Sequence, residues 1–152
     1  MCVHAKYQVK SKKKKLYILF IDFIKAYDRV PRHKLVEYMK TLGCGRMMLS
    51  ALMNMYKNTW NVLNSTIIDT SSGVRQGALT SCLLFTTYVD KMVRLIKESV
   101  HNDGFLGRLH VLLLMDDTVI LATSREKCLK KLEAVLNFCD EHGMEINEKK
   151  SL

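Results

Sequence analysis

Residues 16–22 read LYILFID, six apolar residues followed by a single acid. A continuous apolar run rich in aromatic and branched side chains is typical of a central strand that is buried on both faces. We therefore predict a central strand over Leu16–Ile21, which places Asp22 at its carboxyl end.

Downstream of this strand, apolar residues recur at helical spacing in four segments. They predict helices over residues 35–42, 47–57, 83–96 and 123–142. Thr123, with Glu126 three residues later, resembles a capping box that opens the last helix, and Gly143 is a natural C-terminal stop.

Extended structure is predicted for the remaining segments. Residues 60–69 are strand-like, two apolar runs at 110–114 and 118–122 predict a β-hairpin with acids at its turn, and 144–147 starts another extended piece. The order strand, helices, hairpin, helix and strand predicts an α+β fold, in which helices cover one face of a largely antiparallel sheet. The split β-α-β (ferredoxin-like) arrangement has this order.

Length and charge narrow the class of protein. A chain of 152 residues with 48% hydrophobic residues and a single proline fits one globular domain, and it excludes collagen-like and disordered classes. Lys and Arg number 24 against 15 Asp and Glu, a net charge of +9, which suggests an anionic partner, either nucleic acid or an acidic membrane surface. Part of the excess lies in residues 1–15, a basic N-terminal segment that taken alone is more often a solvated tail.

Other classes are excluded by what the sequence lacks. No apolar stretch approaches the ~20 residues of a membrane-spanning helix, so we do not expect this chain to be a membrane protein. The five cysteines include no close-spaced pair, so neither a zinc site nor a disulfide framework is indicated. Without a secretory signal at the N-terminus, we expect an intracellular protein of the nucleus or cytoplasm that is not secreted.

Acidic residues follow the predicted central strand and occupy the predicted hairpin turn. If Asp22 and the pair Asp116-Asp117 converge, their carboxylates repel one another unless cations neutralise them. Mg²⁺ prefers such oxygen ligands, and two ions ~3.5–4 Å apart support phosphoryl transfer. Asp is also common in ordinary turns, and for Asp116-Asp117 alone that reading is the better one.

Four motifs decide between these readings. In chain order they are FIDFIKAYD over residues 20–28, GVRQG over 73–77, LMDDT over 114–118, and GMEIN over 143–147 followed by Lys150. Together they resemble successive motifs of reverse transcriptases, and most closely those of non-LTR (LINE-type) retrotransposons.

The resemblance implies a fold and an activity. Residues 16–152 would form the polymerase palm with part of the fingers, truncated at both ends relative to the family and with the thumb absent. The family is an RNA-directed DNA polymerase that uses two Mg²⁺ ions, with Mn²⁺ as a substitute, to transfer dNTPs to a primer 3′ end. An RNA template, a DNA primer and dNTPs are thus the expected partners, together with other parts of a retrotransposon protein.

The resemblance also assigns catalytic roles. Asp22 and Asp116 match the principal metal ligands, and Asp117 matches the neighbouring acid of the metal site. Lys150 matches a lysine that lies near the phosphates and donates a proton to the leaving pyrophosphate. A surface lysine in a basic tail is the equally weighted alternative for Lys150.

Nucleotide-binding positions follow from the same motifs. Tyr27 falls on the position that stacks under the incoming sugar, although without the motif a core aromatic is the better interpretation. Gln76 and Gly77 match the turn that lies against the incoming nucleotide. The alternative interpretation of Gly77 is a glycine that only allows an ordinary loop to turn. Phe23, next to the first acid, is included among the nucleotide-binding residues.

Two residues are assigned to the template or primer, namely Arg75 and Met115. Near the first motif, Asp28 with Arg29 and Arg32 is interpreted as a surface ion-pair cluster.

Three functional hypotheses result. The leading one is a reverse transcriptase domain fragment, with weak or no polymerase activity in the isolated chain, because the binding energy of complete fingers and thumb is missing. The second is a non-catalytic nucleic-acid-binding remnant of such an element, whose binding weakens steeply with salt. The third is another two-metal nucleotidyl transferase or cyclase, against which Tyr27 and the 73–77 motif argue.

Overall fold

The computed structural model comprises two compact units, one of residues 1–26 with 89–152 and one of residues 27–88. Each unit is described separately below. The structure describes residues 6–9, 14–57, 59–63, 66–70, 72–75, 77–148 and 150–151.

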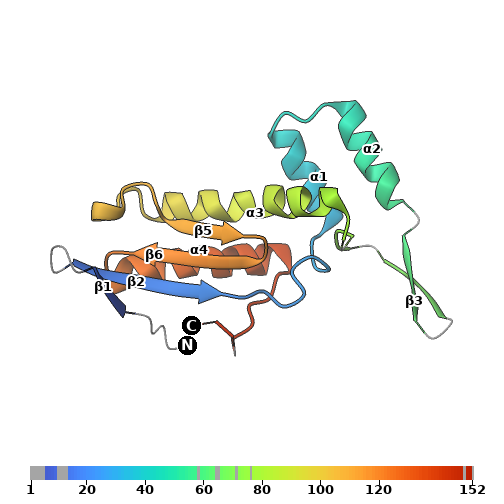
Figure 1. Cartoon of the computed structure of the whole chain (residues 1–152). Helices are drawn as coiled ribbons and strands as arrows, with labels where there is room; N and C mark the ends of the chain where they lie inside the picture. Colours follow the sequence, from blue (N-terminus) through green and yellow to red (C-terminus); the bar gives the residue numbers. More distant parts are fainter. Residues whose placement is uncertain are drawn as a thin grey trace. The chain divides into compact units, whose positions relative to one another are not determined.

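The first unit is built on a four-stranded antiparallel sheet (Figure 1). Its strands are β1 (Lys6–Val9), β2 (Lys14–Ile21), β5 (Val111–Leu114) and β6 (Asp117–Ala122), in the spatial order β1-β2-β6-β5. The predicted central strand is therefore an interior strand, and the predicted hairpin is β5 with β6. The strand β1 lies within the segment that the sequence marks only as basic.

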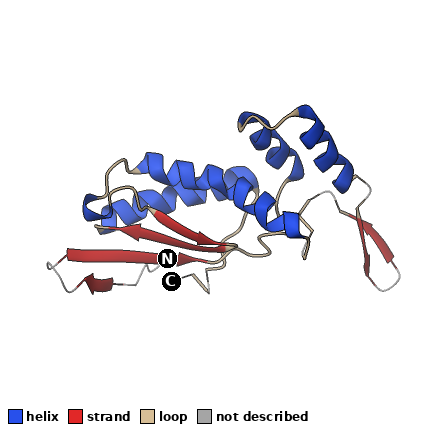
Figure 2. Ribbon diagram, turned by 45° about the horizontal axis from the view of Figure 1, so that its top comes forward, coloured by secondary structure: helices blue, strands red, loops and turns tan. Residues whose placement is uncertain are grey.

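Helices cover one face of this sheet (Figure 2). They are α4 (Arg125–His142) and residues 89–99 of α3 (Leu79–Ser99). On the covered face, Leu19 and Ile21 are almost fully buried, whereas Phe20 between them is 42% exposed. The prediction of a strand buried on both faces is thus wrong for β2, whose second face is open.

The boundaries of α4 show how a distant contact moves a helix cap. Ser124, not the predicted Thr123, is the N-cap, and its side chain accepts a hydrogen bond from the Lys127 amide at 3.3 Å. The Thr123 hydroxyl donates instead to Asp103 at 2.5 Å, so it is committed elsewhere. Gly143 ends the helix in the left-handed region, as predicted.

A buried ion pair ties α4 to the loop before β5. Asp103 and Lys131 have fully buried side chains, and the Lys131 ammonium donates to Asp103 and to the Leu121 carbonyl. Burial raises the pKa of the Asp103 carboxyl, but the hydrogen bonds from Lys131 and Thr123 outweigh it and lower the pKa to about 2. Both charges are paired, which the interior requires.

The lowered pKa of Asp103 predicts a loss of stability in acid. Its carboxyl titrates at 3.8 when unfolded and at about 2 when folded, so this contribution is complete above pH 3.8 and is lost as the pH falls through 2. Between pH 5 and pH 2 the loss is about 2 kcal/mol. Urea unfolding of the wild-type chain and of Asp103→Asn measures it: the difference in unfolding free energy between the two should shrink by this amount. If the difference in unfolding free energy between the wild type and Asp103→Asn were the same at pH 5 and pH 2, the predicted acid effect would be contradicted.

After α4 the chain returns to the end of β2. The extended piece predicted over residues 144–147 pairs with the chain after β2 through one antiparallel bridge, Phe23 to Ile146, and is too short to count as a strand of the sheet. The main chain nevertheless runs beside Asp22, whose carbonyl accepts from the Asn147 amide at 2.8 Å. This return brings the last motif onto the first.

The second unit contains two helices, a hairpin and the start of a third helix. These are α1 (Arg32–Thr41), α2 (Arg46–Tyr56), β3 (Trp60–Leu63) paired with β4 (Thr66–Asp69), and residues 79–88 of α3. Both short helices are where their apolar spacing predicts them. Residues 60–69, predicted as strand-like, form the hairpin, and α3 begins four residues before its predicted start.

Arg32 organises this second unit. Its guanidinium donates to the carbonyls of Gly73 at 2.8 Å and Thr70 at 2.6 Å, and to the Thr59 hydroxyl at 2.7 Å. It also lies 4.7 Å from the centre of the Tyr56 ring. Arg32 therefore joins α1, the end of α2, the base of the hairpin and the 73–77 segment.

The solvent-facing side of α2 is rich in methionine. Met47, Met48, Met53 and Met55 are between 41% and 88% exposed, while Leu49 and Leu52 are buried.

Within the described part of the chain, no helix has the length and apolar character needed to cross a bilayer.

Candidate functional site

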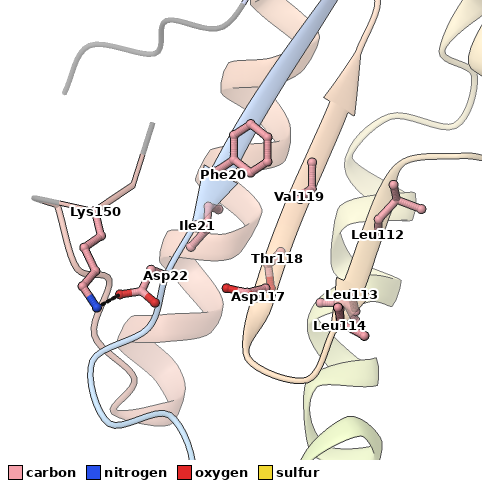
Figure 3. A pocket seen from close by; sticks show the side chains of 10 residues that line it. All are labelled: Phe20, Ile21, Asp22, Leu112, Leu113, Leu114, Asp117, Thr118, Val119 and Lys150. Atoms are coloured by element: carbon pink, nitrogen blue, oxygen red, sulfur yellow. Dashed lines mark ion pairs between the residues drawn. The ribbon is translucent and has the colours of Figure 1, made fainter.

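A pocket lies at the end of β2, on the first unit. It is bounded by the end of β2, by the β5–β6 hairpin and by the returning C-terminal segment (Figure 3). Its lining residues are Phe20, Ile21, Asp22, Leu112, Leu113, Leu114, Asp117, Thr118, Val119 and Lys150. Three of the predicted catalytic residues are in this set.

Two acids face each other across the neighbouring strands. Ile21, the last residue of β2, pairs with Thr118, so the same register carried one residue further sets Asp22 opposite Asp117 at the end of the two strands. Figure 3 shows the Asp117 carboxylate directed from β6 toward the side on which Asp22 lies. The register of the sheet therefore brings the first and third motifs together.

The last motif closes on Asp22 from the other side. Lys150 Nζ lies 3.8 Å from Asp22 Oδ2, and its side chain is 71% exposed (Figure 3). Asn147 Nδ2 donates to the same oxygen at 3.0 Å, and Ser151 Oγ accepts from the Asp22 amide at 3.2 Å. Sequence reasoning assigned no role to Asn147 or Ser151. Only the four-motif pattern, which includes Asn147, could have drawn attention to it.

Asp116 has a different position from its neighbour. The β5–β6 turn consists of Met115 and Asp116 alone, with Met115 at φ +56°, so Asp117 belongs to β6 and not to the turn. Asp116 does not line the pocket. Among the residues that the structure describes, no three His, Cys, Asp or Glu side chains gather into a group able to hold a metal ion. Of the three predicted acids, the pocket thus unites Asp22 and Asp117.

Phe23 is 4% exposed and belongs to the core, so its side chain is not available to a nucleotide. Any contact of Phe23 with a nucleotide would therefore be made by its main chain. Strand alternation explains the burial, because residues 19, 21 and 23 all face the covering helices.

The remaining predicted residues lie in the second unit. Tyr27 stacks on Phe85 with ring centroids 4.6 Å apart, and its carbonyl accepts from the Val74 amide at 2.9 Å, which joins the first and second motifs. Gly77 is exposed at φ +81°, and Arg75 donates to the Met55 carbonyl at 3.3 Å. Gln76 lies outside the described residues.

Cysteine chemistry offers no competing site. The cysteines within the described ranges are free thiols, namely Cys44, Cys82, Cys128 and Cys139. Burial raises the pKa of the Cys139 thiol to about 12, so it is protonated at neutral pH.

Comparisons with known proteins bear on these motifs. The chain is 30% identical over 151 residues to a Pol polyprotein of the type-1 retrotransposable element R2 from Nasonia vitripennis, with 94% of this chain covered. It is 23% identical to the R2DM Pol polyprotein from Drosophila melanogaster, with 88% covered. The chain spans 14% and 13% of the length of these two relatives.

The fold has solved counterparts as well. Telomerase from Candida tropicalis, solved with a fragment of telomeric RNA, matches 95% of this chain with a TM-score of 0.65 at 17% identity, where the chain covers 27% of that protein. At this identity the likeness concerns the fold.

The family of reverse transcriptases (RNA-dependent DNA polymerases) matches residues 1–152. This match covers every described element of both units, including β2, which precedes Asp22, and β6, which begins at Asp117. It confirms the resemblance that the four motifs indicate, and the chain belongs to the reverse transcriptase family.

Proposed function

We propose that this chain is the catalytic part of an RNA-directed DNA polymerase, which adds deoxynucleotides to a primer 3′ end on an RNA template. The observation that carries the proposal is the opposed pair Asp22 and Asp117, with Lys150 beside it, in one open pocket. Carboxylates next to an ammonium suit a reaction in which triphosphate charge must be neutralised and a pyrophosphate released. The first unit would then be the palm, and the second would be part of the fingers.

The donor chemistry of this pocket fits divalent ions. Asp22 and Asp117 offer hard oxygen ligands, and Mg²⁺ is usually held by one or two carboxylates together with waters and substrate phosphates. A complete cage of protein ligands is therefore not required. Asp116, one residue before Asp117, would remain a metal ligand, as the third motif assigns it. The ions, when bound, supply activation of the primer hydroxyl and stabilisation of the leaving oxygen.

Residues around the pocket would hold the substrates. Lys150 reaches solvent and can meet the phosphates or donate a proton to pyrophosphate. The primer end would lie on the apolar residues of the open face, Phe20 and Leu114, and against Met115 at the turn. The net charge of +9 favours a nucleic acid partner.

For the residues of the second unit, the roles that the motifs assign remain part of the proposal. Tyr27 would lie under the sugar, and its backbone link to Val74 would keep the 73–77 segment in register with it. Gln76 and Gly77 would lie against the base pair, with Arg75 toward the template. An intracellular site of action would follow from such substrates.

Primer extension tests the proposal. The chain is given poly(rA) primed with oligo(dT), labelled dTTP and Mg²⁺, and it is compared with Asp22→Asn and Asp117→Asn. We expect each substitution to lower the rate by about 100-fold, the scale on which lost electrostatic stabilisation acts, and chelation of the metal to abolish extension. Asp140→Asn is the control, because it removes an exposed acid of α4 and should leave the rate unchanged.

Two outcomes would contradict the proposal. Variants of Asp22 and Asp117 that extend primers as fast as the wild type would exclude the pocket as the active site. No extension by the isolated chain is compatible with a fragment that lacks complete fingers and thumb. If RNA binding then falls steeply with salt and is unchanged in Asp22→Asn and Asp117→Asn, the result would instead support a non-catalytic nucleic-acid-binding remnant.

A further inference from the structure

We infer that Asn147 is a positioning residue for the metal site: its amide holds one oxygen of the Asp22 carboxylate and leaves the other for a divalent ion. The inference rests on the proposed function, because it assumes that Asp22 binds the metal. Its observation is the 3.0 Å hydrogen bond from Asn147 Nδ2 to Asp22 Oδ2, between residues 125 positions apart.

The main chain fixes Asn147 independently of its side chain. The Asn147 amide donates to the Asp22 carbonyl at 2.8 Å, and the Asn147 carbonyl accepts from the amides of Lys150 at 3.1 Å and Ser151 at 2.9 Å. Ser151 Oγ in turn accepts from the Asp22 amide. Removal of the Asn147 side chain would therefore leave this segment attached to β2, so the side chain is free to serve the carboxylate.

The contacts of Asp22 are concentrated on one oxygen. Both Asn147 and Lys150 approach Oδ2, and within the described ranges Oδ1 takes part in no hydrogen bond or ion pair. The terminal torsion of an aspartate is broad and roughly two-fold, so a carboxylate without a fixed partner rotates freely. A neutral amide donor stops that rotation and adds no positive charge that would repel an ion.

Lys150 cannot take over this role. Its ammonium is 3.8 Å away on a flexible stem that is 71% exposed, and such a pair holds little orientation. Without the amide, the ammonium could approach either oxygen of Asp22 and compete with the ion there. Asn147 thus keeps the Lys150 charge on the far side of the carboxylate from the position for the metal.

Mn²⁺ binding, followed by electron paramagnetic resonance of the free ion, tests the inference on the whole 152-residue chain without any need for catalysis. Asn147→Leu removes the donor and keeps the branched shape of the side chain, and Asn147→Ala removes the donor without adding apolar bulk. We expect both to weaken Mn²⁺ binding by about 10-fold, the lower end of the cost of losing a group that orients a ligand. The melting temperature should stay close to that of the wild type.

Controls separate positioning from structure. Glu148→Gln changes an exposed acid in the same turn and should bind Mn²⁺ like the wild type. In an Asp22→Asn background, Asn147→Leu should cause no further loss, because the amide acts only through that carboxylate. Wild-type affinity in both Asn147 variants would overturn the inference alone, whereas a wild-type chain that binds no Mn²⁺ would overturn the proposed metal site and the inference with it.

Discussion

Lys131→Met should destabilise the chain by about 3–5 kcal/mol, the usual cost of removing one partner from a buried ion pair. Methionine keeps the length of the side chain but leaves the Asp103 carboxylate, which is fully buried, without its main partner. It also leaves the Leu121 carbonyl without the donor that now lies at 2.6 Å. Because a domain of this size is stable by only about 5–15 kcal/mol, much of the folding free energy would be lost.

Urea unfolding followed by circular dichroism measures this effect, and Lys127 supplies the matched control. Lys127 Nζ lies 3.4 Å from the same carboxylate, but its side chain is 33% exposed. Lys127→Met should therefore cost about 1 kcal/mol or less. The double variant Asp103→Leu with Lys131→Met should regain part of the loss, because no uncompensated charge remains. Equal losses from Lys127→Met and Lys131→Met would contradict the account.

Gly73→Ala should be the second large effect, at about 2–5 kcal/mol. Gly73 has φ +86°, where a side chain costs about 1–2 kcal/mol. A Cβ there would also lie 2.9 Å from the Asp28 carbonyl oxygen and 3.0 Å from the Asp28 Cα, and this overpacking adds about 1–3 kcal/mol. The neighbours are main-chain atoms and cannot turn away, so the backbone itself must shift.

Gly77 provides the control for that substitution. It has a similar φ of +81°, but a Cβ built on it meets nothing within 4 Å. Gly77→Ala should therefore cost only the conformational term, about 1–2 kcal/mol. Thermal unfolding of the two variants distinguishes the terms, and the two losses would be the same if contact with Asp28 were irrelevant.

Local sequence patterns predict much of this fold. The apolar run of β2, the hairpin of β5 and β6 and the helical spacing of α1, α2 and α4 depend on neighbours in the chain, so the sequence shows them directly. The strand β1 is different, because the alternation of polar and apolar residues in Lys6–Val9 covers only four positions within a basic segment, and the strand is defined by its pairing with β2. The open face of β2 also escapes prediction, since an apolar run reads the same whether helices cover one face or two.

The candidate site also has one part that the sequence predicts and one part that only the structure shows. Motif wording identifies Asp22, Asp117 and Lys150, and the structure brings these three into one pocket. Contacts between distant residues leave no local pattern: the bond from Asn147 to Asp22 spans 125 positions, and the pair of Asp103 with Lys131 spans 28. In the sequence, Asp103 and Lys131 look like ordinary surface charges, and only the packing of the structure shows that their side chains are buried.

The methionine-rich face of α2 has a chemical consequence. Peroxide converts a thioether to a polar sulfoxide and attacks exposed side chains first. Met47, Met48, Met53 and Met55 are exposed, whereas Met39, Met92 and Met144 are at most 4% exposed in the core. The α2 methionines would therefore consume oxidant in its first encounters with the chain, and the thioethers that support the core would be spared.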